Sequence, residues 1–333
     1  MPSRLPSGWP GGARKSAVAL TEAIPDLLLY SSHDRCAYLH GHWIVRRALA
    51  AENRLSVLYL PFSMRSLEQQ HYSWDTFNWY FSRFTACGLS ADAFFWTPHL
   101  SQADIGSFFQ QIMDAEVVIL GGGHPLVGLE RYGAMGERMA ADPCLFPELL
   151  WHRQAKKKLT VGFSAGADQL AEWCSSHSGR KAYGLAKGIM TLLHYDHSKQ
   201  GRLRHVAARH PDCLVFGLPN DSGIAVSQGR LPGGWWQRLD FIIDNSWEFP
   251  ADSCHIKTRQ GQKIDHVYAD GRYWGFNGGD AMLRLVSDRG RQLWIKQPLD
   301  DRWFDYHSQL HSREDPLRLP AFSHLRAAGE SKK

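Results

Sequence analysis

The fold is constrained most by a regular alternation of short apolar runs with longer amphipathic stretches, which begins at Asp26. Five short runs, rich in aliphatic and aromatic residues, are typical of buried strands and cover residues 27–31, 56–61, 93–97, 117–120 and 159–163. Helix-like stretches separate them at residues 37–52, 74–87, 104–115 and 147–157. This order predicts an α/β fold with a doubly wound, mostly parallel sheet flanked by helices.

The chain has 333 residues, of which 44% are hydrophobic, so it can bury an extensive core and is not globally disordered. We expect residues 1–22, rich in Pro and Gly, to form a flexible arm, and residues 23–230 to form the α/β domain. Residues 231–333 change to a strand–turn–strand pattern, with turn residues at 270–271 and 288–290. This pattern predicts a β-rich C-terminal extension, whose tryptophans form either a ligand platform or the anchor of a thin core.

Charge and cysteine content narrow the functional classes. The net charge of +5 at pH 7 is spread along the chain, whereas nucleic-acid binding needs a concentrated basic face. No apolar stretch reaches the roughly 18 residues of a membrane-spanning helix, and the longest apolar run near the N-terminus, residues 17–20, is too short for a secretory signal. The six cysteines form no CxxC pair and are interpreted as free thiols. We therefore expect a cytoplasmic protein that binds neither nucleic acid nor membrane.

Two glycine-rich loops follow predicted strands, at the sheet edge where ligand sites of such folds lie. Residues 121–124 read Gly-Gly-Gly-His after the fourth strand, and residues 162–166 read Gly-Phe-Ser-Ala-Gly after the fifth. The second loop has the GxSxG pattern of a nucleophile elbow, in which a sharp strand-to-helix turn exposes the serine. Ser164 is therefore the candidate nucleophile.

A serine hydroxyl becomes an effective nucleophile when a nearby base accepts its proton. His194 is the best candidate, because it directly follows the apolar run at residues 189–193 and so also lies at the end of a predicted strand. Several histidines and Asp196 cluster downstream of this strand, but their spacing does not match the HExxH zinc motif. We expect no metal ion.

Acyl transfer also needs backbone amides that bind the negative charge on the carbonyl oxygen. The amides of Gly122 or Gly123, together with that of Ala165 after the nucleophile, are candidates for this oxyanion hole. The triple-glycine loop does not fit a dinucleotide site, because Leu126 stands where the third glycine of GxGxxG belongs. We expect no cofactor.

The ordered set of a Gly-Gly-Gly loop, Gly-Phe-Ser-Ala-Gly-Ala at 162–167 and His-Tyr-Asp at 194–196 resembles the dipeptidase E and cyanophycinase family of serine peptidases. The resemblance covers about residues 26–228. It extends to Gly-Arg-Leu at 201–203 and to residues 215–226, which resemble the closing strand pair of the family. It implies a fold similar to class I glutamine amidotransferases.

The resemblance also implies roles for individual residues. Ser164 would be the nucleophile and His194 the base, with the glycine amides and Ala165 as the oxyanion hole. The family cuts short peptides next to an aspartyl residue, so we expect a small aspartyl or isoaspartyl peptide as substrate. Arg202, with Arg204 behind it, is the candidate for binding its carboxylate. A homodimer is compatible with these expectations.

Three positions depart from the family pattern. His124 follows the glycines where relatives commonly have Asn or Gln, which bears on substrate contacts. The third member of the triad is Asp196, two residues after the histidine, or else Glu172 or Asp221. At residues 220–221 the chain has Asn-Asp, and Asn220 stands where relatives often carry an acid.

Two alternatives remain open from the sequence. An α/β-hydrolase esterase would use the same elbow with a late histidine, His307 or His311, and an acid at Asp300 or Asp301. A binding or regulatory protein could instead retain the fold without efficient catalysis.

Overall fold

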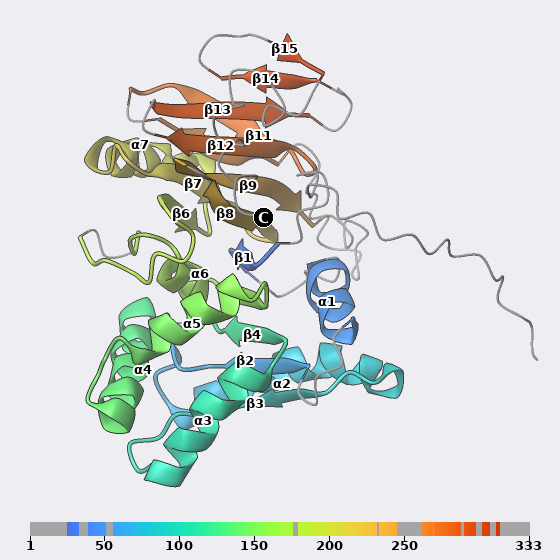
Figure 1. Cartoon of the computed structure of the whole chain (residues 1–333), viewed down its shortest axis with the longest axis vertical. Coiled ribbons are helices and arrows are strands. Elements are labelled where there is room, and N and C mark those ends of the chain that lie inside the picture. Colours follow the sequence, from blue (N-terminus) through green and yellow to red (C-terminus); the bar gives the residue numbers. More distant parts are fainter. Residues whose placement is uncertain are drawn as a thin grey trace, which may run out of the picture.

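The computed structural model describes residues 25–32, 39–50, 56–175, 179–231, 233–244, 262–268, 270–287, 290–297, 302–306 and 311–313. The expected arm at residues 1–22 lies outside them. Figure 1 shows the C-terminal strands at one end of the molecule and helices α2 to α5 at the other. The strands form an 11-stranded sheet in the order β15-β14-β13-β12-β9-β8-β1-β5-β4-β2-β3, and a 4-stranded sheet in the order β11-β10-β7-β6.

Five strands at one end of the large sheet are mutually parallel, and they carry the α/β part of the chain. In spatial order they are β3 (Ala91–Ala93), β2 (Val57–Leu60), β4 (Val117–Leu120), β5 (Leu159–Phe163) and β1 (Leu27–Tyr30). All but β3 are fully buried, which matches their nearly continuous apolar sequences. The strand expected at 93–97 lies earlier, because only residues 91–93 pair with β2.

Helices cover both faces of this parallel part, which confirms the predicted doubly wound α/β fold. Successive strand residues point to opposite faces, so Leu27 and Leu29 belong to one buried cluster while Leu28 and Tyr30 belong to the other. The first cluster is covered by α3 (Gln102–Asp114), α4 (Pro125–Ala140), α5 (Leu145–Ala155) and α6 (Ala165–Leu170). The second is covered by the π-helical turn η2 (Leu39–Val45), α1 (Arg46–Leu49) and α2 (Leu67–Phe81), which continues into η3 (Ser82–Cys87).

Helix α4 was not among the helices expected from the sequence. Its glycines obscure the helical pattern, and two of them are required by packing. A Cβ at Gly128 would lie 2.1 Å from Gln169 Nε2, and one at Gly136 would lie 2.4 Å from the carbonyl oxygen of Asp142. The low helix propensity of these residues is therefore offset by close tertiary contact.

The β-rich C-terminal part continues the large sheet in antiparallel order. Strand β8 (Ser222–Leu231) pairs with β1, and the remaining strands are β9 (Gly234–Ile243), β12 (Ala281–Ser287), β13 (Gly290–Lys296), β14 (Trp303–Asp305) and β15 (His311–Ser312). Because β8 runs across residue 230, the backbone ladder is continuous where the sequence suggested a domain boundary.

The small sheet combines strands from both predicted regions. Strand β6 (Ile189–Leu193) is parallel to β7 (Leu214–Leu218), and the hairpin of β10 (Ile264–Val267) and β11 (Tyr273–Phe276) adds antiparallel to β7. The turn η4 (His197–Lys199) and helix α7 (Gln200–Arg209) connect β6 to β7. The two strands expected within residues 215–226 are present as β7 and β8, but they do not pair with each other, because they belong to different sheets.

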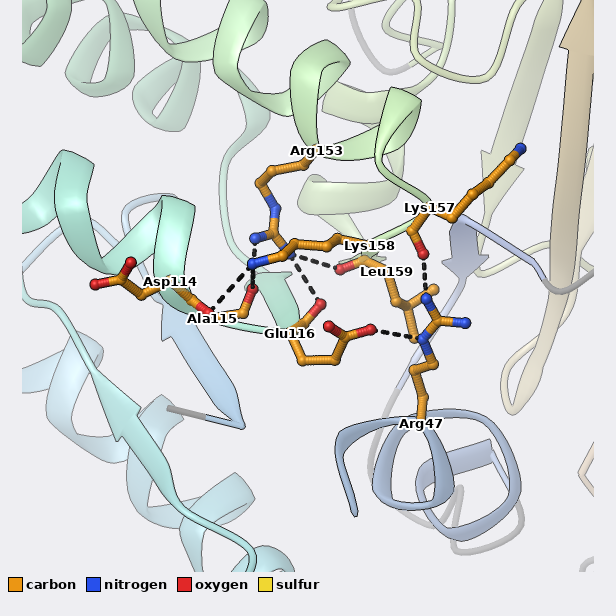
Figure 2. A network of polar contacts seen from close by, with 8 residues as sticks. All are labelled: Arg47, Asp114, Ala115, Glu116, Arg153, Lys157, Lys158 and Leu159. Carbon is orange, nitrogen blue, oxygen red and sulfur yellow. Dashed lines mark hydrogen bonds and ion pairs between the residues drawn. The ribbon is translucent and has the colours of Figure 1, made fainter. Parts of the chain in front are cut away.

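A buried arginine holds the ends of β4 and β5 that are remote from the two glycine-rich loops (Figure 2). Arg153 on α5 is 0% exposed, and its guanidinium donates to the carbonyl oxygens of Ile112, Ala115, Glu116 and Leu159 at 2.5, 2.6, 3.1 and 3.1 Å. Burial lowers the pKa of Arg153 to about 9. A single cation therefore donates to four carbonyls from two chain segments, residues 112–116 and Leu159.

Neighbouring cations extend this network. Lys158 Nζ donates to the carbonyl oxygens of Met113, Asp114 and Ala115 at the end of α3. Arg47 on α1 forms an ion pair with Glu116 at 2.7 Å and also donates to a carbonyl of the turn after α5. The network connects helices on both faces of the sheet.

We expect Arg153→Met to lower the free energy of unfolding by about 3–5 kcal/mol, because it removes the buried guanidinium that donates to four carbonyl oxygens. Urea denaturation followed by circular dichroism measures this loss. Arg138→Met is the control, since Arg138 is exposed and, within the described part of the chain, its guanidinium donates only to the carbonyl of Leu100. A loss at Arg153 no larger than that of the control would contradict the structural role.

Candidate active site

Ser164 lies in a strained turn between β5 and α6. Its backbone has φ of 48° and ψ of −110°, in a region that side-chain-bearing residues rarely adopt. The flanking glycines make the turn possible. A Cβ at Gly162 would lie 2.5 Å from the backbone nitrogen of Ala167, and one at Gly166 would lie 2.1 Å from the carbonyl oxygen of Leu120 on β4. The motif thus has the backbone geometry of a nucleophile elbow.

His194 follows β6 and faces the serine. Its Nε2 lies 3.1 Å from Ser164 Oγ, although 30 residues separate the two in the chain. The backbone of His194 is also left-handed, with φ of 50°. Its amide donates to Ser31 Oγ at 2.6 Å, which connects this loop to the end of β1.

The partner of His194 on the other side of the ring is Asn220. The distance from His194 Nδ1 to Asn220 Oδ1 is 2.7 Å. When Nδ1 carries the proton and donates it to this oxygen, the lone pair of Nε2 points at the serine hydroxyl. Ser164, His194 and Asn220 therefore form a continuous hydrogen-bonded chain. An amide takes the place that the sequence analysis assigned to an acid.

Asp196, the expected third member, is engaged elsewhere. Its carboxylate accepts the amide and hydroxyl of Ser198 at the start of η4 and forms an ion pair with Lys199 at 3.0 Å. The hydrogen bonds from Ser198 and then Lys199 lower the pKa of Asp196. Lys199 Nζ in turn donates to the carbonyl oxygen of His194. The carboxylate thus supports the loop of His194 rather than its imidazole.

The other two acids considered also have different partners. Glu172 accepts the amide of Gly188 at 3.2 Å and lines a separate cleft of about 850 Å³ between α4, α5 and residues 180–187. Asp221 is buried beside Asn220 and accepts the hydroxyl of Ser32 at 3.0 Å. The group that lies within hydrogen-bonding distance of His194 Nδ1 is the Asn220 amide oxygen and not one of these carboxylates.

The triple-glycine loop lies next to Ser164. A Cβ at Gly122 would lie 3.6 Å from Ser164 Cβ, which sets the distance between the two loops. Gly123 has φ of 126°, and a Cβ there would lie 2.3 Å from the carbonyl oxygen of Ser63. No acceptor from the described residues binds the amide of Gly122 or Gly123. Ala165, the third oxyanion candidate, is the first residue of α6.

Sequence reasoning missed the side chains that hold this loop. Gln169 on α6 is fully buried and donates to Ser63 Oγ at 2.9 Å and to the carbonyl oxygen of Pro125 at 2.8 Å. Arg131 on α4 donates to three carbonyls of residues 62–65 and stacks on Trp96 at 4.2 Å. The only sequence signal for Gln169 is its place with Asp168 as the two polar residues of the short helix after the GxSxG motif.

No contact joins the predicted substrate-binding residues to Ser164 among the described residues. His124 is the N-cap residue of α4, directly after Gly123. Arg202 and Arg204 are exposed on α7, and Arg202 donates to the carbonyl oxygen of Ser175 at 3.0 Å. Among the described residues, no three His, Cys, Asp or Glu side chains gather as a metal site would require.

The residues of the alternative esterase site are mostly outside the described chain. His307, Asp300 and Asp301 lie there, and for His311 only the backbone in β15 is described. Six strands separate β15 from β5, which places that backbone roughly 30 Å from the elbow strand at the usual strand spacing. Of the C-terminal tryptophans, Trp294 and Trp303 are buried in a small apolar cluster, as an anchoring role requires.

No described helix is both long and apolar enough to cross a membrane.

Comparison with known proteins relates the chain to solved structures by fold. No protein-family model matches the sequence, and no curated protein is significantly similar to it. The chain is similar to the crystal structure of a peptidase from an acI-B1 Actinobacterium, with a TM-score of 0.52 and 14% sequence identity. The match covers 78% of this chain and 96% of that one. At this identity the likeness establishes a shared fold.

We expect Gly166→Ala to destabilise the protein by about 3 kcal/mol or more, because the added methyl group overlaps the backbone of Leu120. Urea denaturation measures the change. Gly106→Ala on α3 is the matched control, since a Cβ there meets nothing within 4 Å. The control is expected to gain about 0.5–1 kcal/mol from helix propensity. Equal stabilisation of both variants would contradict the close approach at the elbow.

Proposed function

We propose that this chain is a serine-type hydrolase of the peptidase class. The observation that carries the proposal is the hydrogen-bonded chain from Ser164 Oγ through the His194 ring to Asn220. Further support comes from the strained backbone of Ser164 and from the fold shared with a peptidase of known structure. The sequence motifs that resemble the dipeptidase E and cyanophycinase family agree with this assignment.

The reaction follows from the positions of these groups. Ser164 Oγ attacks the substrate carbonyl carbon while its proton passes to His194 Nε2. The carbonyl oxygen becomes negative and accepts hydrogen bonds from the amides of the glycine loop and of Ala165. The tetrahedral intermediate then collapses, and His194 gives its proton to the leaving amine. Water, deprotonated by His194, releases the acyl group and restores the serine.

The role of Asn220 differs from that of an aspartate at the same position. Its amide oxygen orients the ring and selects the Nδ1–H tautomer, so that Nε2 can act as the base. It carries no charge, and it therefore stabilises the imidazolium that forms during the reaction less than a carboxylate would. A Ser–His–Asn arrangement therefore acts mainly by orienting the imidazole, and less by stabilising its positive charge.

We infer that the substrates are small peptides with an acidic residue at the cleaved bond. Basic side chains follow His194 on η4 and α7, where Lys199, Arg202 and Arg204 lie within ten residues of the base. A guanidinium binds a carboxylate through two parallel hydrogen bonds, which provides specificity for aspartyl groups. Aspartyl and isoaspartyl dipeptides are the first substrates to test.

We expect a fluorophosphonate probe to label wild-type protein at Ser164, because the probe reacts with serines activated by a neighbouring base. Mass spectrometry of the labelled peptide identifies the site. Ser164→Ala abolishes the labelling, whereas Ser107→Ala, an exposed serine on α3, leaves it unchanged. Equal labelling of wild type and Ser164→Ala would reject the assignment.

Asn220 provides a separate test of the base. We expect Asn220→Ala to slow labelling by roughly 10- to 100-fold, since the ring loses the acceptor that orients it. Asn220→Asp keeps an acceptor for the Nδ1–H and is expected to label at least as fast as wild type. Rates from a time course of probe incorporation distinguish these cases. An Asn220→Ala variant as fast as wild type would show that the amide does not orient His194.

A further inference from the structure

The loop that carries His194 is held in an unusual conformation. His194 has φ of 50°, and a left-handed residue with a large side chain persists only where its surroundings over-determine it. The amide of His194 donates to the Ser31 hydroxyl at 2.6 Å, and the amide of Tyr195 donates to the carbonyl oxygen of Leu218 at 2.9 Å. These contacts fix the backbone. The side chains that follow His194 have a partner of their own.

That partner is the carboxylate of Asp265 on β10. Asp265 is 2% exposed and lies opposite Gly217 in the pairing of β10 with β7. Its Oδ1 accepts the hydroxyl of Tyr273 from β11, and its Oδ2 lies 3.6 Å from His197 Nδ1. A buried carboxylate is costly unless hydrogen-bond donors face it, and the Tyr273 hydroxyl is such a donor.

Tyr195, the residue after His194, completes the cluster. Its side chain is 5% exposed and packs on Gly217, where a Cβ would lie 2.6 Å from the Tyr195 Cγ. Burial and, next, the carboxylate of Asp265 raise the pKa of the Tyr195 hydroxyl. The Tyr195 hydroxyl is buried and has no hydrogen-bond partner among the described residues. His266, the next residue on β10, points to the other side and donates to the carbonyl oxygen of Val215.

We propose that Asp265 is a positioning residue that holds the Tyr195–His197 turn and thereby aims the His194 ring at Ser164. This inference rests on the proposed function. It assigns a role to the C-terminal hairpin of β10 and β11, which lies outside the α/β part that carries the nucleophile. The hairpin completes the site through the turn after His194, without touching the reacting atoms.

The experiment compares Asp265→Asn with Asp280→Asn. Both residues are buried carboxylates of the C-terminal strands, and Asp280 accepts the amide of Asn277 near β12, away from the His194 loop. Saturation kinetics of fluorophosphonate labelling separate kinact, which depends on the base, from KI, which depends on binding. We expect Asp265→Asn to lower kinact by about tenfold with KI unchanged, and Asp280→Asn to leave both constants unchanged.

Two further measurements keep the outcomes distinct. If Asp265→Asn does not fold, Tyr273→Phe takes its place as the test variant, because it removes one donor but keeps the carboxylate. We expect Tyr273→Phe to lower kinact by about threefold. The His194 ring signals in a proton–carbon NMR spectrum should shift in Asp265→Asn and stay in place in Asp280→Asn. Unchanged kinact in Asp265→Asn, with Ser164 labelled, would overturn the positioning role alone. Absent labelling of wild type would overturn the proposed function, and unshifted His194 signals would then overturn the positioning role as well.

Discussion

The site depends on one close approach of backbones, where the turn after β5 passes the end of β4. At Gly166 there is no room for a Cβ beside the carbonyl oxygen of Leu120, and at Gly162 there is none beside the start of α6. This contact forces Ser164 into a left-handed conformation that exposes its hydroxyl. It also brings the triple-glycine loop, which follows β4, within reach of the serine. The geometry of Ser164 is thus a consequence of strand and helix packing.

The two ends of the parallel strands have different tasks. At one end, Arg153 and its neighbours satisfy buried carbonyls and join the helices of both faces. At the other end, backbone amides and polar side chains remain available around Ser164. Such a division is expected in α/β folds, whose ligand sites lie at the carboxyl ends of the strands. The costly burial of a cation stabilises the scaffold at a distance from the chemistry.

Strand ends were predictable from the sequence, but side-chain partners were not. Ser164 and His194 both directly follow apolar runs, so the sequence placed each at the end of a strand. Their strands, β5 and β6, belong to different sheets, and only the packing of the two sheets brings the side chains together. Asp196 follows His194 by two residues, yet η4 begins there and draws its carboxylate to Ser198 and Lys199. Asn220 reaches the imidazole because β7 lies beside β6 in the small sheet, a pairing of segments 20 or more residues apart. Local spacing carries no information about that contact.

The sequence by itself determined the class of fold, the parallel strands and the elbow, because periodicity and glycine placement are local properties of the chain. Only the tertiary structure decided how the last hundred residues join the rest. Strand β8 continues the large sheet through β1, while β10 and β11 extend the small one through β7. Strand pairing depends on which edges are free once the core has formed, and this is a property of the whole molecule. The same pairing brings Asp265 to the turn after His194, a neighbour that no sequence pattern indicates.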